Sequence, residues 1–428
     1  MEAFVGEGTV QTSQSLPGNA DQDVNILPRN YPQVIKYMGS KAGILDFLSK
    51  GLAEVHAEDR PLVDLFAGAC AISGGFGHAT QIISNDIQGY SAVIASTYLR
   101  RAELIGNFDI IALAQPIVDC VLASLPENLA YPKEAVNLNA FNIIERRNRK
   151  MIRKEFDSSH HLFTKIYSGT WWSTEQCVWI DAIREVLDTL KNRGSIEQAD
   201  FDFGLTCLLS AMAYTSQGTG HYAQYRDANT SEGMLDILKY RRASVPALFN
   251  RRFGALLEWH LENVVDRGSS LLSLDYRECL AGVKNAVVYA DPPYAFVHYS
   301  RFYHAMETLV RYDYPQIQHI GGKIVKGRYR LERHQSPFCI KTKVRGAFSE
   351  MFEGVKASKS DMLLSYSNTG MIDIQVLIDL ARSHFGDEYK VWVEAMEHTH
   401  STMGRIKDKS RQVKESLIIA KKLESVVR

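Results

Sequence analysis

The sequence predicts an α/β fold in which helices cover a mostly parallel sheet, with an antiparallel strand at one edge and a large helical insert. After residue 30, short apolar runs alternate with helical stretches, which is the pattern of a mostly parallel sheet. Residues 85–285, between the second and third strand candidates, are predominantly helical in pattern. The last two strand candidates flank a long polar, basic connection, which favours an antiparallel pair at the sheet edge.

The elements follow one another in a simple order. The first 30 residues are rich in Gly, Ser, Gln, Asn and Asp without periodicity, so we expect a disordered N-terminal arm. In the insert, Ser173 and Gln176 can form a capping box before a helix with apolar residues at helical spacing. Strand candidates lie at 62–66, 81–84, 286–290, 362–365, 389–393 and 416–420. We therefore expect an arm at 1–30, an α/β domain at 31–100 and 266–428, and an inserted helical region at 101–265.

Composition limits the class of protein. A hydrophobic content of 45% supports a sizeable core. No stretch reaches the roughly 18 apolar residues of a membrane span, and the start lacks the basic and apolar regions of a signal peptide. We therefore expect a cytoplasmic protein with no membrane partner. The six cysteines lie far apart without a CxxC pair, so neither a disulfide framework nor a metal site is expected.

Charge is balanced over the chain but not along it. Basic and acidic residues number 49 each, so net charge gives no argument for a nucleic-acid partner. Two segments are locally basic, from Arg146 to Lys154 and from Lys323 to Arg345. Such segments either contact phosphates or form a solvated surface, and the sequence leaves both interpretations open.

A candidate ligand-binding turn follows the first strand candidate. The segment PLVDLFAGACAISGGFG runs from an apolar strand through a Gly-containing turn into small residues that begin a helix. Such a turn lets the backbone approach a ligand closely. Asp86 ends the next strand, where a carboxylate can accept hydrogen bonds from ribose hydroxyls. The structural alternatives are an ordinary strand-to-helix connection and a helix N-cap at Asp86.

The strongest single motif is the tetrapeptide Asp291-Pro292-Pro293-Tyr294 at the end of the strand candidate 286–290. Asp291 and the Pro292 carbonyl can accept both hydrogens of an exocyclic amine, and the two prolines keep the loop rigid. Tyr294 offers a flat face for a base that has left the duplex. This pattern suits methyl transfer from a sulfonium to an aromatic amine by alignment, without a metal. A turn that merely ends the strand is the alternative.

These motifs resemble those of the Dam-like N6-adenine DNA methyltransferases. The segment from Lys36 to Lys41 (KYMGSK) is similar to the family's N-terminal cofactor motif, and the segment from Asp64 to Gly68 (DLFAG) to its Gly-rich turn. Asn85-Asp86 matches the family's acidic position, and Asp275 resembles the acid that holds the cofactor adenine. The motifs occur in the family's order between residue 36 and about residue 370.

The resemblance implies a Rossmann-like S-adenosylmethionine-dependent methyltransferase fold, S-adenosyl-L-methionine as cofactor and double-stranded DNA as substrate. The cofactor-binding residues that it implies are Tyr37, Lys41, Asp64, Phe66, Ala67, Gly68, Asp86, Ile87, Asp275, Tyr276 and Asp291. The implied catalytic residues are Asp291, Pro292, Pro293 and Tyr294. Segments similar to those of longer members make Thr219, His221, Tyr222, Ser300, Arg301 and Tyr303 expected DNA contacts. The motif order assigns target recognition to the insert at 101–265.

One residue departs from the family pattern, because Cys70 stands where the second Gly of the turn is usual. We expect its small side chain to permit the turn, and its close approach to the cofactor is left open. Several residues also have structural interpretations. Tyr37 and Lys41 can begin a surface helix, Asp275 can form a turn, and Tyr222, Arg301 and Tyr303 can be core or surface residues.

The sequence thus predicts a site-specific adenine-N6 methyltransferase that flips its target base out of duplex DNA. Its role is restriction-modification or that of an orphan enzyme, and a cognate restriction endonuclease is an open partner. Sequence fixes neither the recognition site nor the oligomeric state. The alternatives are an RNA base N-methyltransferase and a non-catalytic DNA-binding regulator on the same scaffold. A nucleotide-dependent oxidoreductase is disfavoured because the turn lacks full GxGxxG spacing.

Overall fold

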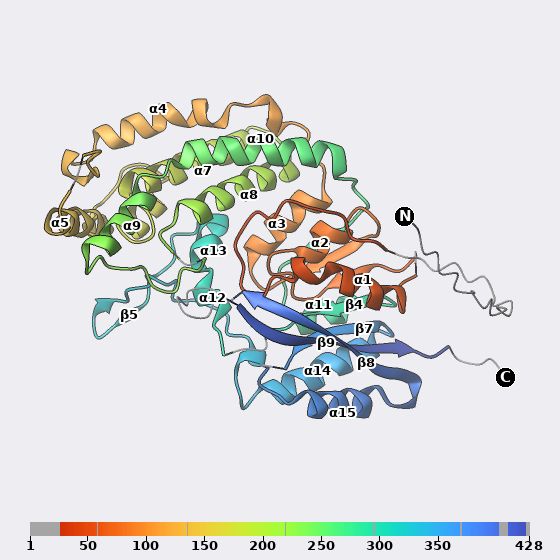
Figure 1. The fold of residues 1–428 in the computed structure, drawn as a ribbon. Helices are drawn as coiled ribbons and strands as arrows, with labels where there is room; N and C mark the ends of the chain where they lie inside the picture. The colour runs from red at the N-terminus through yellow and green to blue at the C-terminus, as the bar shows by residue number, and fades with distance from the viewer. Residues whose placement is uncertain are drawn as a thin grey trace, which may run out of the picture.

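The computed structural model describes residues 26–57, 59–134, 136–218, 220–293, 296–368, 370–401 and 410–424. Within these ranges the centre is a seven-stranded sheet in the order β3-β2-β1-β4-β7-β9-β8 (Figure 1). Strands β3 to β7 in this order are parallel to their neighbours, whereas β9 is antiparallel to both β7 and β8. The strands are β1 (Leu62–Asp64), β2 (Ile82–Asn85), β3 (Ser270–Leu272), β4 (Val287–Ala290), β7 (Asp361–Ser367), β8 (Tyr389–Ser401) and β9 (Ser410–Lys422). The predicted Rossmann-like α/β fold is confirmed.

All six expected strands form, and a seventh was not expected. β3 is three half-buried residues long, which is too short to show an alternating pattern in the sequence. The expected antiparallel pair at the edge is confirmed, since β8 pairs with β9 from Tyr389↔Lys422 to Ser401↔Ser410. Of the two, β8 is the edge strand and β9 lies between β8 and β7.

Both faces of the sheet are covered by helices. In β4, Val287 and Tyr289 belong to the core on one face, and Val288 and Ala290 to the core on the other. This is why the strand is apolar throughout, as central strands of parallel sheets are. The first face packs against α1 (Leu45–Ala53), α2 (Ala71–Phe76) and α3 (Gly89–Leu99). The second packs against α11 (Tyr276–Gly282), α14 (Val344–Ala357) and α15 (Ile374–Phe385).

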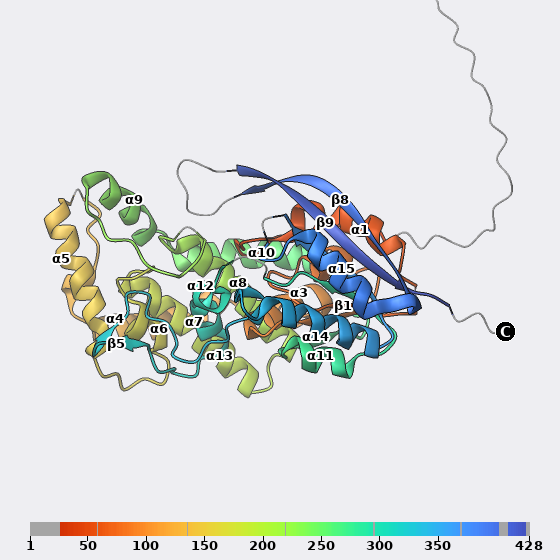
Figure 2. The same cartoon turned by 90° about the horizontal axis from the view of Figure 1, so that it is seen from below.

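A bundle of helices lies to one side of the sheet in both Figure 1 and Figure 2. Its core includes the fully buried Trp171 and Trp172. The expected capping box is present, because Ser173 N donates to Gln176 Oε1 (2.8 Å) and Gln176 N donates to Ser173 Oγ (3.1 Å). The helices are α4 (Ile110–Ala123), α5 (Leu138–Arg149), α6 (Leu162–Tyr167), α7 (Thr174–Asn192), α8 (Gln198–Thr215), α9 (Ser231–Arg241) and α10 (Val245–Asn263).

A second chain segment, residues 298–335, packs onto this bundle. It comprises α12 (Tyr299–Phe302), α13 (His304–Arg311) and the hairpin strands β5 (His319–Ile320) and β6 (Lys323–Ile324). Arg184 of α7 donates to Val310 O (3.0 Å), and the Tyr312 hydroxyl donates to Asp181 Oδ1 of α7 (2.5 Å). We call residues 101–265 together with 298–335 the helical unit. It is therefore built from two stretches that flank β4 in the sequence.

The packed part of the chain begins earlier than expected, because residues 26–30 were assigned to the N-terminal arm. Residues 26–30 are packed against the body: Ile26 is buried, and its carbonyl accepts a hydrogen bond from Ser49 Oγ (2.6 Å). The Arg29 guanidinium donates to Gly74 O (3.0 Å) and lies over the Trp259 ring at 4.7 Å. The sequence did not predict these two anchoring residues, because the polar composition of the segment indicated disorder. Residues 1–25 lie outside the described part of the chain.

A buried ion pair fastens α5 to α9. Arg241 Nε donates to Glu145 Oε1 (2.8 Å), and Glu145 also accepts from Arg149 (2.9 Å) and the Tyr131 hydroxyl (2.5 Å). Burial alone would raise the pKa of Glu145, but the neighbouring Arg241 lowers it below its usual range. The carboxylate is therefore charged in the folded protein.

We predict that Glu145→Ala lowers the free energy of unfolding by about 3–5 kcal/mol, because it leaves the buried Arg241 charge without its carboxylate. Urea unfolding followed by circular dichroism measures this. Glu155→Ala is the matched control, since it removes an exposed pair with Lys165 (3.3 Å) and should cost less than about 1 kcal/mol. Equal losses in the two variants would contradict this account of the pair.

Candidate active site

Three carboxylates meet at the carboxyl ends of adjacent strands. Asp64 ends β1, Asp86 follows β2 and Asp291 follows β4, and these strands are neighbours in the order β2-β1-β4. Burial raises the pKa of Asp64 well above its usual range, and the Asp291 and Asp86 carboxylates add to the shift. Burial also raises the pKa of Asp86, to about 6. This edge of the sheet is acidic and poorly hydrated, so a cation bound there would be strongly favoured.

One buried lysine faces this edge. Lys41 Nζ lies 2.8 Å from Asp291 Oδ2 and 3.5 Å from Glu415 Oε1, and its side chain is only 5% exposed. Ser365 Oγ of β7 donates to Glu415 Oε1 (2.7 Å). The burial of Lys41 rules out the alternative that it begins a surface helix. Glu415 was not predicted from the sequence, because it reaches the site only through the pairing of β9 with β7.

The Gly-containing turn adopts a ligand-binding geometry. Gly68 has a left-handed backbone (φ +51°), and its N–H donates to Asp86 Oδ2 (2.9 Å). A Cβ at Gly68 would lie 2.8 Å from Tyr37 Cε1, so only glycine fits. Cys70 also has a positive φ (61°) and is fully buried as the N-cap residue of α2. The turn therefore keeps a left-handed backbone at the position where the family usually has its second Gly.

Tyr37 is fixed above this turn by aromatic stacking. Its ring stacks on Tyr303 with centroids 4.5 Å apart and lies 5.8 Å from the ring of Tyr299. The Tyr303 hydroxyl accepts a hydrogen bond from Met38 N (2.8 Å). The segment after the catalytic tetrapeptide thus supports the N-terminal cofactor motif, a contact between residues that are distant in sequence.

Asp86 lies where the sequence placed it. Its Oδ1 accepts from Gln88 N (2.9 Å), and Gln88, not Asp86, is the N-cap residue of α3. The alternative interpretation, that Asp86 is the N-cap residue of a helix, is therefore wrong. Ile87 is exposed beside it, and Ala67 N donates to Asn85 O (2.8 Å), which joins the turn to the end of β2.

Asp275 has a clear structural role. It is the N-cap residue of α11, accepting from Arg277 N (3.0 Å), and it forms an ion pair with Arg277 Nε (2.8 Å). The neighbouring Tyr276 is buried, and its ring lies 6.0 Å from Phe66 and 5.2 Å from Phe338. The turn-forming interpretation of Asp275 is thus correct, and the expected contact with a cofactor adenine stays a prediction.

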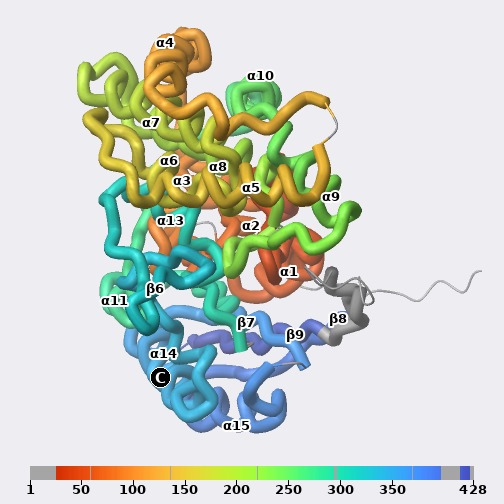
Figure 3. Tube along the Cα trace, turned by 90° about the vertical axis from the view of Figure 1, so that its left-hand side faces the viewer, coloured from red at the N-terminus to blue at the C-terminus, as the bar shows by residue number. Residues whose placement is uncertain are grey.

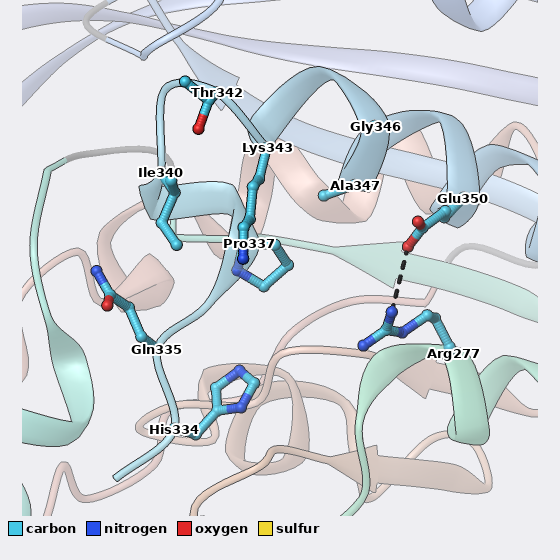
Figure 4. Close-up of a pocket in the computed structure, with 10 residues that line it drawn as sticks. All are labelled: Arg277, His334, Gln335, Pro337, Ile340, Thr342, Lys343, Gly346, Ala347 and Glu350. Atoms are coloured by element: carbon cyan, nitrogen blue, oxygen red, sulfur yellow. Dashed lines mark hydrogen bonds and ion pairs between the residues drawn. The ribbon is translucent and has the colours of Figure 1, made fainter.

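A pocket of about 430 Å³ adjoins this region between α11 and α14 (Figure 4). Arg277 and Glu350 line one part of it and form an ion pair at 3.5 Å, while His334 and Lys343 line another. The pocket is lined by both polar and apolar residues and contains none of the expected catalytic residues. Arg277 pairs with Asp275, and the three carboxylates of the acidic edge do not line the pocket.

The catalytic tetrapeptide is described in part. Asp291 is 17% exposed and Pro292 is buried, whereas Pro293 is half-buried and its carbonyl accepts from Cys339 Sγ (3.4 Å). The loop thus presents the Asp291 carboxylate at the tip of β4. Tyr294 lies outside the described residues, as does Thr219.

Two of the expected DNA contacts need correction. Tyr222 and Tyr303 are buried, the first against Trp171 and Trp172 and the second under Tyr37, so neither side chain is presented to DNA. The sequence left open whether these two tyrosines are core residues, and the structure shows that they are.

The remaining expected contacts are more accessible, with one exception. Arg301 is exposed, and His221 is half-buried and stacks on Phe302 at 4.4 Å. Ser300 is buried and donates to His334 O.

The site suits S-adenosylmethionine on the chemistry of its residues. At Gly68 the Tyr37 ring packs directly against the backbone of the turn, where a side chain would otherwise lie. Asp86 supplies an acceptor for ribose hydroxyls, and the carboxylates of Asp64 and Asp291 complement a positively charged donor. Among the described residues, no helix combines the length and apolar character needed to cross a membrane.

Comparison with known proteins agrees with this site. The family model described as D12 class N6 adenine-specific DNA methyltransferase matches residues 37–119 and 239–361. The chain is 22% identical to Modification methylase LlaI of Lactococcus lactis subsp. lactis, over 91% of the chain and 55% of that protein. It is 25% identical to Type II methyltransferase M.FokI of Planomicrobium okeanokoites, over 84% of the chain and 48% of that protein.

A shorter relative matches over most of its own length. Type II methyltransferase M.NlaIII of Neisseria lactamica is 22% identical over 79% of the chain and 85% of that protein. The chain thus spans about half the length of LlaI and M.FokI. The family match includes Lys41, Asp64, Asp86 and Asp291, the residues that form the acidic edge and its lysine. The chain is a Dam-like member of the D12 class N6 adenine-specific DNA methyltransferase family.

Proposed function

We propose that this chain transfers a methyl group from S-adenosylmethionine to the N6 nitrogen of an adenine in a specific sequence of duplex DNA. The observation that carries this proposal is the buried Lys41–Asp291 pair at the tip of β4, next to the Gly68 turn and Asp86. Three of the relatives carry names that describe modification methylases or type II methyltransferases. These names support DNA as the substrate and restriction-modification as the setting.

The cofactor supplies an electrophilic methyl group on a sulfonium. When bound, the cofactor would be held at its ribose by Asp86 and flanked by Tyr37 and Ile87, and Asp275 with Tyr276 would border its adenine. Asp291 and the Pro292 carbonyl accept the two hydrogens of the target amine, which directs the nitrogen lone pair at the methyl group. Tyr294 stacks on the flipped base. Lys41 holds the Asp291 carboxylate in place through the ion pair of 2.8 Å.

The helical unit is the region that we assign to target recognition. Residues 120–238 lie outside the ranges matched by the family model, as expected for a part that differs with the sequence read. A cognate restriction endonuclease is the proposed partner, acting on the same DNA sequence in the cytoplasm. Protection of host DNA from that nuclease by this chain alone would support the pairing.

Incubation with radiolabelled S-adenosylmethionine and separate duplex DNA, RNA and protein tests the substrate class. We expect label in duplex DNA only, recovered after digestion as N6-methyladenine by mass spectrometry. Label in RNA would favour the RNA base methyltransferase, and absence of label from all three would favour a non-catalytic regulator.

We predict that Asp291→Ala lowers kcat for DNA methylation by about 10²–10³-fold or more, because the amine loses its charged acceptor. Cofactor binding should remain measurable by calorimetry, since Asp86 and the Gly68 turn are intact. Asp387→Ala, which changes an exposed carboxylate at the opposite end of the sheet, is the control and should retain full activity. Full activity in the Asp291 variant would refute the assignment.

We also predict that cofactor affinity falls as the pH is lowered through about 6. Burial raises the pKa of Asp86 to about 6, so below this pH the group is protonated and no longer a charged acceptor. Log Kd should approach a slope of one per pH unit below pH 6. The titratable groups that face Asp86 are Tyr37, Asp64, Cys70, Tyr90 and Glu307.

Asp86→Asn isolates the contribution of Asp86 from those neighbours. The variant should bind more weakly at pH 8 and lose the added pH dependence, as measured by calorimetry between pH 5.5 and 8.5. Parallel pH profiles for the two proteins would exclude Asp86 as the titrating acceptor.

A further inference from the structure

We infer that the hairpin of residues 317–330, which follows the catalytic loop in the sequence, enters a groove of the DNA substrate. Ile320 at its tip contacts base edges, and Lys323 contacts the phosphate backbone. This inference rests on the proposed function and extends target recognition beyond the insert at 101–265.

The tip of the hairpin is built to project. β5 and β6 are joined by Gly321 and Gly322, both with positive φ (57° and 74°), as a tight two-residue hairpin turn requires. A side chain added at either glycine would meet no atom within 4 Å, so the turn stands clear of the rest of the protein. A two-stranded ribbon of this kind has the width that the major groove of B-form DNA admits.

The base of the hairpin, in contrast, is held firmly. The Arg330 guanidinium makes two hydrogen bonds of 2.6 Å to the Asp313 carboxylate, and Arg328 donates to Ile166 O and to Arg149 O (3.0 Å). The Tyr329 hydroxyl donates to Ala223 O. Both arginine side chains are buried. A rigid base under an exposed tip is the arrangement that positions a recognition element accurately.

The chemistry of the tip fits DNA. Ile320 is 67% exposed and Ile324 is 38% exposed, and the exposed Lys323 stands between them. Apolar side chains on DNA-binding ribbons contact thymine methyl groups or base steps, and neighbouring cations neutralise phosphates.

The hairpin is also continuous with a basic surface. Its Arg328 bonds to the backbone of Arg149, the last residue of α5, and exposed cations follow around that helix end: Arg146, Arg147, Lys150 and Arg153. Lys326 of the hairpin base pairs with Asp227, which also pairs with Arg149. Positive charge beside the base of the hairpin, together with Lys323 at its tip, matches the charge of a duplex backbone, which favours DNA over a protein partner.

The hairpin lies on the side of the molecule to which the active site opens. α12 follows the carboxyl end of β4 closely in sequence, and its Tyr299 lies 5.8 Å from the ring of Tyr37, so α12 lies at the carboxyl ends of these strands. In Figures 1 and 2, β5 lies on that same side, beyond α12. Figure 3, seen from that side, shows β6 between α13 above and α14 below. One duplex crossing this side can therefore meet both the hairpin and the acidic edge.

The test uses the full chain with plasmid DNA as methyl acceptor. Ile320→Ser should lower kcat/KM for DNA methylation at least tenfold, while Ile320→Val stays within about threefold of the parent protein. Lys323→Ala should weaken binding to any duplex and lower the slope of log Kd against log salt by about one. Cofactor Kd and melting temperature should not change in any of these variants.

Leu423→Ser and Lys421→Ala are the matched controls, because both residues are exposed at the far end of β9. If the Ile320 and Lys323 variants behave like these two controls in an active enzyme, the hairpin assignment is overturned. If the parent protein transfers no methyl group to DNA, the proposed function itself is wrong. Fluorescence anisotropy with a labelled duplex distinguishes the cases, since it reads the Lys323 effect on binding without methyl transfer.

Discussion

The ion pair between Lys41 and Asp291 is the constraint on which the rest of the site depends. Three carboxylates converge at the tips of β1, β2 and β4; burial raises the pKa of Asp64 and Asp86, and repulsion by the Asp291 and Asp86 carboxylates raises the pKa of Asp64 further. Lys41 compensates this repulsion at Asp291, and Glu415 holds the lysine from its other side. The site is thus electrostatically unfavourable before a cation binds, which is a common property of active sites that bind charged substrates.

The same pair explains why distant parts of the chain must assemble before the site exists. Lys41 precedes the first strand, Asp291 follows the fourth strand in the sequence, and Glu415 lies on the last. Tyr303 adds a fourth contact by stacking on Tyr37, so the cofactor motif is supported by the segment that leads into the hairpin. The N-terminal motif and the segment that leads into the hairpin therefore form one connected structure.

Much of this could be predicted from the sequence, and the failures have physical causes. Strand positions, the Gly turn, Asp86 and the catalytic tetrapeptide all depend on local patterns, which the sequence displays directly. β3 was missed because three half-buried residues carry no periodicity. Glu415 was missed because only the pairing of β9 with β7 brings it to Lys41. Tyr222 and Tyr303 were expected to contact DNA because a motif does not reveal whether a tyrosine points inward.

The two-segment construction of the helical unit has an evolutionary consequence. Because residues 298–335 pack against residues 101–265 through Arg184, Arg328 and Tyr312, the unit cannot be exchanged between relatives as one contiguous cassette. A chimera that replaced only the insert would pair a foreign bundle with the native hairpin, and the buried arginines would face unmatched carbonyls. New sequence preferences in this lineage are therefore expected to arise by paired changes on either side of the catalytic strand.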